Sequence, residues 1–224
     1  MIIERKEYLE KLIAWKDKQL IKIVTGVRRC GKSMLLEIYR NYLKEHGIEE
    51  EQIISINFED LDYEELTDYR KLYKYLKKRL IDGKMTYIFL DEIQNVTDFP
   101  KVLDSLYIKK NIDIYVTGSN AYMLSSEIAT MISGRYIQIE MLPLSFKEYM
   151  ESTGSMNDRG IKYAEYLQNS SFPFTLELKN QPDEIRDYLE GIYNTIVVKD
   201  IINRKKITDT MMLKSVLRFV FDNI

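Results

Sequence analysis

The sequence predicts an α/β fold, in which a five-stranded parallel sheet is followed by a helical subdomain. Over residues 20–142, short apolar runs alternate with helical segments, which is the pattern of parallel strands joined by right-handed crossovers. The run at 85–90 is almost wholly apolar, as expected of a strand covered on both faces. No strand pattern follows Ser145. We therefore expect a sheet domain over 1–144 and a helical region over 145–224.

The elements of the sheet domain can be placed in order along the chain. Apolar residues recur at helical spacing over 4–16, which predicts the first helix. An apolar run at 21–25 predicts the first strand, and the next helix is expected over 32–45 because Gly47 stops it. The remaining elements are expected as a strand at 53–58, a helix at 69–81, a strand at 85–90, a helix at 98–109, a strand at 112–116, a helix at 122–132 and a strand at 136–141. Pro143 closes the last strand.

The helical region is expected to open with a helix near residue 145, because Ser145 and Glu148 form a capping-box pattern. Further helical stretches are predicted near 160–168, 183–203 and 208–222. We interpret the region as a helical lid that leads into the start of a C-terminal region.

Composition excludes several classes of protein. The 224 residues are 45% hydrophobic and 30% charged, as in ordinary globular proteins. The chain contains no run of about 18 apolar residues, so no membrane helix is expected, and its start lacks the apolar core of a signal peptide. A net charge of −2 gives no general attraction to nucleic acid. Cys30 is the single cysteine and His46 the single histidine, which excludes an intramolecular disulfide and most zinc sites and favours a reducing, cytoplasmic location.

The stretch GVRRCGKS at residues 26–33 matches G-x-x-x-x-G-K-[ST], the loop that wraps the phosphates of a nucleotide. Its glycines let backbone N–H groups approach phosphate oxygens, and the following helix adds its unpaired N–H groups. Lys32 is expected to neutralise the β- and γ-phosphates, and Ser33 to hold Mg²⁺ through its hydroxyl. The predicted nucleotide-binding residues are Gly26, Val27, Arg28, Arg29, Cys30, Gly31, Lys32, Ser33 and Met34.

Two acidic residues, Asp91 and Glu92, follow the apolar strand at 85–90. An aspartate at a strand tip can hold Mg²⁺ through its water shell, and a glutamate beside it can deprotonate the attacking water. Acidic residues after a strand are common, but a phosphate loop about sixty residues upstream makes the pair specific. We predict Asp91 and Ser33 as metal ligands and Glu92 as the catalytic base.

Polar residues also follow the strand at 112–116. In hydrolytic P-loop proteins with an extra strand, that strand lies between the phosphate-loop strand and the acidic strand, so its tip points at the γ-phosphate. Either Ser119 or Asn120 would make this contact. Asn120 is favoured because its amide can both donate to the phosphate and accept from the water. A plain turn is the alternative.

Five motifs in this order resemble the archaeal and bacterial AAA-like ATPases: GVRRCGKS at 26–33, FLDEIQ at 89–94, TGSNA at 117–121, SGRY at 133–136 and LPLSF at 142–146. The resemblance, which covers the whole chain, implies a P-loop NTPase core of the additional-strand, catalytic-glutamate type with a small helical lid. Family members usually continue into a winged-helix domain and a nuclease-like domain, and this chain is expected to end near the first winged-helix helix. It departs from the family at 170–173, where relatives tend to carry Gly-Gly before the aromatic-proline pair.

Arg135 occupies the place from which AAA-type ATPases send an arginine to the γ-phosphate of a neighbouring subunit. A guanidinium group suits the negative charge that develops on a transferring phosphoryl group. The resemblance thus implies a homo-oligomer that shares sites through Arg135. The alternative is a structural arginine that pairs with a local carboxylate.

The leading hypothesis is an Mg²⁺-dependent ATPase that drives a conformational switch or DNA-linked work, with Lys32, Glu92, Asn120 and Arg135 as catalytic residues. A second hypothesis is a nucleotide-gated module that hydrolyses slowly and recruits partners. A small-molecule phosphoryl-transferase is disfavoured, since such kinases lack the glutamate beside the acidic strand residue. ATP is expected over GTP because no Asn-Lys-x-Asp segment occurs. DNA contact would rest on the basic patch at 203–206, which also suits a solvated helix end.

Overall fold

The computed structural model describes residues 3–119, 132–154, 158–178, 181–196, 201–202 and 207–223. The chain divides into two compact units, Met1–Pro173 and Phe174–Ile224. The boundary predicted after residue 144 falls inside the first unit, so the assignment of 145–224 as a lid stays a prediction.

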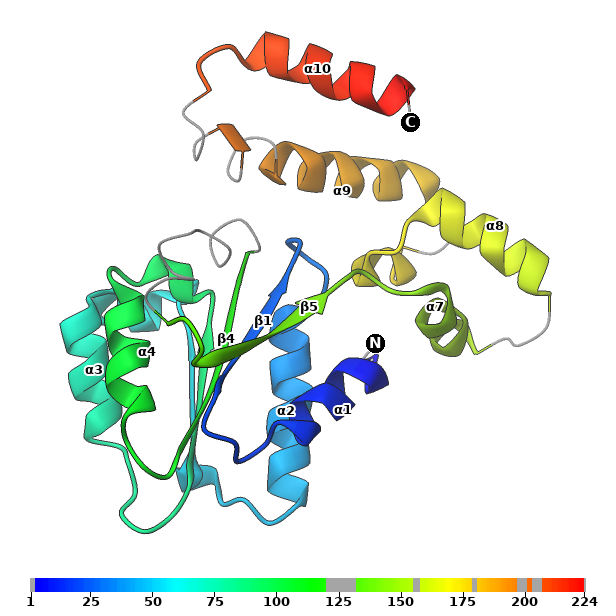
Figure 1. The fold of residues 1–224 in the computed structure, drawn as a ribbon. Coiled ribbons are helices and arrows are strands. Elements are labelled where there is room, and N and C mark those ends of the chain that lie inside the picture. Colours follow the sequence, from blue (N-terminus) through cyan, green and yellow to red (C-terminus); the bar gives the residue numbers. More distant parts are fainter. Residues whose placement is uncertain are drawn as a thin grey trace. The chain divides into compact units, whose positions relative to one another are not determined.

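A parallel sheet of five strands forms the centre of the first unit (Figure 1). Its strands are β1 (Ile21–Gly26), β2 (Ile53–Asn57), β3 (Thr86–Asp91), β4 (Ile112–Ser119) and β5 (Tyr136–Met141). They lie in the order β2-β3-β4-β1-β5, and every neighbouring pair is parallel. The predicted sheet is therefore confirmed, and β4 lies between the phosphate-loop strand and the acidic strand.

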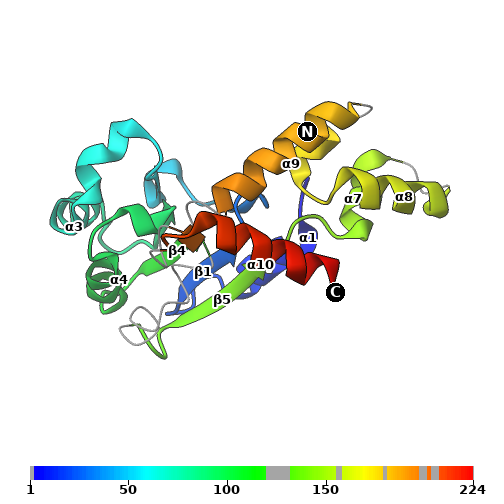
Figure 2. The same cartoon turned by 90° about the horizontal axis from the view of Figure 1, so that it is seen from above.

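Helices cover both faces of the sheet. On one face lie α3 (Tyr69–Lys77) and α4 (Phe99–Tyr107), and on the other lie α1 (Lys6–Ala14) and α2 (Lys32–Glu45) (Figure 1). The view from above shows the same separation of α3 and α4 from α1 (Figure 2). Alternate residues of each strand point to opposite faces, so Ile23 packs in the α3–α4 layer and Val24 in the α1–α2 layer.

Within the described part of the sheet region, three short 3₁₀ helices lie between the predicted elements: η1 (Glu50–Gln52), η2 (Leu61–Thr67) and η3 (Ile93–Asn95). The polar segment of η2 carries no apolar period that would have indicated it. Helix α3 ends at Lys77 rather than at residue 81, and α1 begins at Lys6 rather than at residue 4. Strand β4 is longer than predicted because its pairing with β1 continues as far as Gly26 and Ser119.

Helices α7 (Phe146–Thr153) and α8 (Arg159–Asn169) complete the first unit. The predicted capping box is present: the Ser145 hydroxyl accepts from the Glu148 N–H at 3.3 Å, and the Glu148 carboxylate accepts from the Ser145 N–H at 2.8 Å. The rings of Phe146 and Tyr166, 5.6 Å apart, pack the two helices together.

The second unit contains α9 (Pro182–Thr195) and α10 (Thr210–Asp222). Helix α10 agrees with the helix predicted over 208–222, whereas α9 begins near the predicted residue 183 and ends at Thr195 rather than at residue 203. The short helix η4 (Pro173–Leu176) leads into it. Ile185 and Ile192 are the buried residues of α9. The basic patch at 203–206 lies outside the described residues.

Candidate active site

The phosphate loop joins β1 to α2, which is the strand–loop–helix setting that the sequence predicted. Gly26 ends β1 where a Cβ atom would lie 2.3 Å from the carbonyl oxygen of Met141 and 2.8 Å from the sulfur of Cys30. Gly31 takes a left-handed backbone with φ of 103°, and Arg29 takes one with φ of 67°. The loop thus turns sharply where glycine is required twice, once for space and once for backbone angle.

Lys32 is the first residue of α2 and its side chain is buried. Its ammonium donates to the carbonyl oxygens of Gly26 at 3.1 Å and Val27 at 3.3 Å, so it lies within the loop. The next residues, Ser33 and Met34, are exposed in the first turn of the helix. The N–H groups of a first helical turn have no carbonyl partners within the helix, and together with the positive end of the helix dipole they suit this turn to anions.

The acidic pair lies at the tip of β3. Asp91 is the last residue of the strand, and Glu92 takes a left-handed backbone with φ of 52° that starts η3. Both side chains are largely buried, and Oε1 of Glu92 lies 3.8 Å from Nζ of Lys32. The carboxylate of Glu92 also accepts a hydrogen bond from the Gln94 amide.

Thr117, on β4, contacts both acidic residues. Its hydroxyl donates to the Asp91 carboxylate and accepts from the backbone N–H of Glu92 at 2.9 Å. Thr117 and Gln94 were not among the predicted site residues. Both lie inside motifs that the sequence showed, TGSNA and FLDEIQ, which is the one signal that pointed to them.

The strand register explains why these groups meet. Gly26 pairs with Ser119 of β4 and Met141 of β5, and Asp91 pairs with Asn57 of β2. The carboxyl ends of all five strands therefore share one edge, and ligands of open α/β sheets bind outside such an edge. The structure brings the phosphate loop, Lys32 and both acidic residues together there.

Two further predicted residues belong to the end of β4. Ser119 is the last residue of that strand and lies opposite Gly26. Asn120 lies outside the described residues, as does nearly all of the helix expected at 122–132. The assignment of Asn120 or Ser119 as the γ-phosphate contact stays a prediction.

Arg135 lies at the opposite end of the sheet. Its carbonyl accepts from the N–H of Ile21, the first residue of β1, at 2.9 Å. The six residues of β1 span about 17 Å, so Arg135 is not brought to the phosphate loop of its own chain. Its guanidinium pairs with Asp104 of α4 and lies 5.3 Å from the ring centre of Tyr107. This contact matches the alternative of a local ion pair, and the role towards a neighbouring subunit stays a prediction.

The other loop residues contact neighbouring elements. Arg28 lies 3.6 Å from the carboxylate of Glu59, after β2. Cys30 is fully buried, and burial raises the pKa of its thiol, although the positive charges of Lys32 and Arg5 oppose this. A buried thiol with a raised pKa is a poor nucleophile, because the thiolate is the reactive form.

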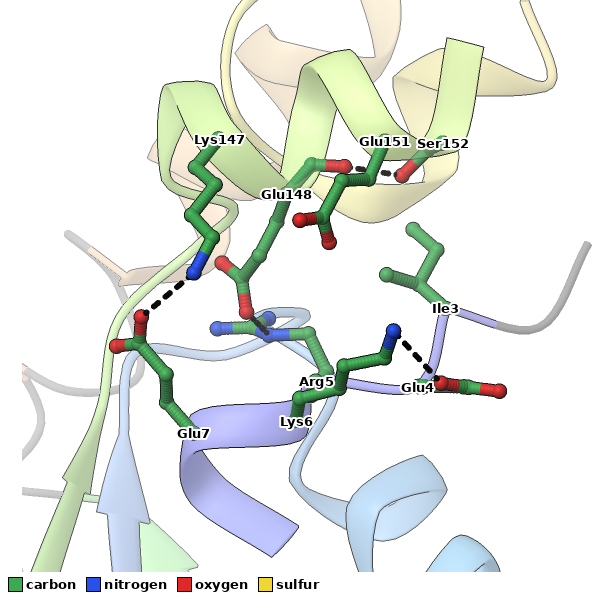
Figure 3. Close-up of a pocket in the computed structure, with 9 residues that line it drawn as sticks. All are labelled: Ile3, Glu4, Arg5, Lys6, Glu7, Lys147, Glu148, Glu151 and Ser152. Atoms are coloured by element: carbon green, nitrogen blue, oxygen red, sulfur yellow. Dashed lines mark hydrogen bonds and ion pairs between the residues drawn. The ribbon is translucent and has the colours of Figure 1, made fainter. Parts of the chain in front are cut away.

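A cavity of about 330 Å³ lies between the start of α1 and α7 (Figure 3). It is lined by Ile3, Glu4, Arg5, Lys6, Glu7, Lys147, Glu148, Glu151 and Ser152. Most of its charged groups pair with one another: for example, Lys147 lies 3.4 Å from Glu7, and Arg5 lies 2.7 Å from Glu148. None of the predicted site residues lines this cavity.

The donor set at the sheet edge fits magnesium. In the described parts of the chain, no three His, Cys, Asp or Glu side chains gather as a metal site. Mg²⁺ does not need such a cluster, because it keeps several waters and takes one or two carboxylates together with phosphate oxygens. The Ser33 hydroxyl and the Asp91 carboxylate are donors of this kind.

Across the described parts of the chain, no helix has the length and apolarity to cross a membrane.

Comparisons with known proteins agree with this fold. The fold resembles that of the Walker-type ATPase paby2304 of Pyrococcus abyssi, with a TM-score of 0.56 at 16% identity over 92% of this chain and 76% of that one. The fold and the loop define a P-loop ATPase-type domain. Residues 18–150 match the AAA domain family, and the chain belongs to that family.

Two relatives are similar in sequence along most or all of this chain. An uncharacterized protein of Haemophilus influenzae is 39% identical over 100% of this chain and 56% of its own length. An uncharacterized protein of Methanocaldococcus jannaschii is 32% identical over 91% of this chain and 46% of its own length. The chain thus spans about half the length of these relatives.

Proposed function

We propose that this chain binds ATP with Mg²⁺ and hydrolyses it, and that the nucleotide state drives a conformational switch. The observation that carries the proposal is the position of Lys32, whose ammonium lies 3.8 Å from the carboxylate of Glu92 at the carboxyl edge of the sheet. This distance supports the proposal, because a cation suited to phosphate lies close to a carboxylate suited to activating water.

The chain's own residues divide the work. The N–H groups at the start of α2 and Lys32 would bind the β- and γ-phosphates. Ser33 and Asp91 would hold Mg²⁺, directly and through water respectively, and the ion would supply charge neutralisation on the phosphate oxygens. Glu92 would orient the attacking water and take its proton. Asn120 is proposed as the contact to the γ-phosphate.

Two further parts of the proposal rest on the family resemblance. Arg135 would release Asp104 and reach the γ-phosphate of a neighbouring copy, which makes a homo-oligomer the active form. Winged-helix and nuclease-like domains in the longer relatives are proposed on the same ground. DNA-linked work is proposed from these domains and the basic patch at 203–206, and a cytoplasmic location from the single cysteine.

A second candidate is a nucleotide-gated module that hydrolyses slowly and recruits partners. One observation favours it: both oxygens of the Glu92 carboxylate face protein groups, because Gln94 donates to one and Lys32 lies near the other. A base held in this way must be released before it can accept a proton from water. Slow turnover follows if release is infrequent.

Turnover of ATP at several protein concentrations, with and without DNA, tests the proposal. We expect Glu92→Gln to lower turnover by about 10²- to 10⁴-fold while a fluorescent ATP analogue still binds. Glu64→Gln, at an exposed acid of η2, is the matched control and should leave turnover unchanged. Unchanged turnover in Glu92→Gln would rule out the hydrolytic role. A turnover per protein molecule that rises with protein concentration and is lost in Arg135→Ala would support active sites shared between subunits. A turnover per molecule that does not depend on protein concentration would exclude them.

A further inference from the structure

Thr117 holds a central place among the acidic residues of the site. It is fully buried, and its hydroxyl carries one proton and two lone pairs. The backbone N–H of Glu92 can only donate, so it takes a lone pair of the hydroxyl, and the hydroxyl proton is donated to the Asp91 carboxylate. One hydroxyl therefore contacts the side chain of the proposed metal residue and the backbone of the proposed base.

Thr117 lies just beyond the end of the pairing between β3 and β4, and this position lets its hydroxyl accept from the backbone N–H of Glu92. The paired register of β3 and β4 ends at Leu90 and Val116, one residue before Asp91 and Thr117. Beyond that point β3 turns away into η3 through the left-handed backbone of Glu92, while β4 continues to Ser119. The Thr117 side chain supplies the Glu92 N–H with the partner that the strand pairing no longer offers.

From this arrangement we propose that Thr117 is a positioning residue for hydrolysis, which acts through Asp91 and Glu92 without touching the nucleotide. The inference rests on the proposed function. The hydroxyl donates to Oδ1 of Asp91, so Oδ2 would be the oxygen that accepts from the water shell of Mg²⁺. It also fixes the turn from which the Glu92 side chain projects. Groups that orient a metal-binding carboxylate from behind are needed for full metal affinity and activity.

Substitutions of Thr117 by valine and by serine distinguish the effect of its hydroxyl from the effect of its side-chain shape. Thr117→Val keeps the shape and removes the hydroxyl, whereas Thr117→Ser keeps the hydroxyl and removes a methyl group. Thr86→Val is the matched control. Thr86 is buried like Thr117 but lies at the start of β3, at the far end of the sheet from the site, and its hydroxyl accepts from the Ile81 N–H at 3.4 Å. Each of the three variants changes a single small group of a buried threonine side chain.

The measurement is a Mg²⁺ titration of ATP turnover and of fluorescent ATP-analogue binding in the full chain. We expect Thr117→Val to lower turnover and raise the Mg²⁺ concentration for half-maximal effect by about 10- to 100-fold, as loss of a supporting contact does in other metal sites. Analogue binding without Mg²⁺ should stay unchanged in Thr117→Val. Thr117→Ser and Thr86→Val should keep the wild-type Mg²⁺ dependence.

Three results overturn the inference: a wild-type Mg²⁺ dependence in Thr117→Val, an equal loss in Thr117→Ser, or an equal shift in Thr86→Val. If Thr117→Val does not fold, Thr117→Ala takes its place with the same expected shift. If the wild-type chain does not hydrolyse ATP, the proposed function fails on its own. The Mg²⁺ dependence of analogue binding then still decides whether Thr117 positions Asp91.

Discussion

The guanidinium of Arg5 donates a hydrogen bond to the carbonyl oxygen of Cys30, 3.0 Å away, inside the phosphate loop. The same side chain donates to the carbonyl of Leu142 at 2.6 Å and pairs with Glu148 of α7 at 2.7 Å. Arg5 is buried, and these contacts join the start of the chain, the phosphate loop and the segment after β5. No motif in the sequence pointed to this residue.

Removal of the Arg5 charge should destabilise the first unit. Arg5→Met would leave the carbonyl oxygen of buried Cys30 without its Arg5 donor and the partly buried Glu148 carboxylate without its cation, and we expect a loss of about 1 to 3 kcal/mol. The stability of Arg5→Lys should lie between those of the wild type and Arg5→Met, because an ammonium cannot reach three separated acceptors as a guanidinium does. Thermal unfolding measures the effect. Arg186→Met is the control: it removes an exposed ion pair with Asp183 and should change the melting temperature little. Equal melting temperatures for Arg5→Met and Arg186→Met would contradict the prediction.

A methyl group at Gly26 should disrupt the phosphate loop. The added Cβ would lie 2.3 Å from the Met141 carbonyl, so β1 and β5 must shift apart, at a cost of about 1 to 3 kcal/mol. We expect Gly26→Ala to lower both thermal stability and nucleotide affinity. Gly160→Ala is the control, because nothing lies within 4 Å of its added Cβ in α8. That variant should be as stable as the wild type or slightly more so. Normal nucleotide binding by Gly26→Ala would show that the loop can adapt.

Lys32→Met should weaken nucleotide binding. A charge-assisted hydrogen bond contributes about 1.5 to 3 kcal/mol, so we expect the dissociation constant of a fluorescent ATP analogue to rise about 10- to 150-fold. Fluorescence anisotropy measures it directly. Lys71→Met, on the exposed surface of α3, is the control for loss of one positive charge and should bind as the wild type does. Equal affinities of the two variants would mean that Lys32 does not contact the phosphates.

The Cys30 thiol should react slowly in the folded chain. Because burial raises its pKa, the thiolate fraction at pH 8 is smaller than that of an ordinary thiol, and thiolate is the reactive form. We expect the rate with a disulfide reagent to keep rising with pH beyond the range in which a free cysteine levels off. The same thiol in denaturant should react at the ordinary rate. Fast modification of the folded chain at neutral pH would contradict the burial.

Much of the fold was predictable because its signals are local. A parallel strand covered on both faces reads as an apolar run, and β3 shows this plainly. The capping box at Ser145 and Glu148 needs only two residues three apart. The length of β4 was not predictable, because its last residues are strand only through their pairing with β1. The helix η2 was likewise hidden, since its polar segment has no apolar period.

For the site, the sequence determined the residue types: a loop that requires Gly26 and Gly31, the cation of Lys32, and the acidic pair Asp91 and Glu92. These follow from chemistry that acts over a few neighbouring positions. The tertiary structure decided how they are held. Thr117 is held beside Asp91 by a strand crossover, and Arg5 is held beside Cys30 by the packing of α1. Such contacts depend on strand order and distance in space, which no local pattern of residues encodes.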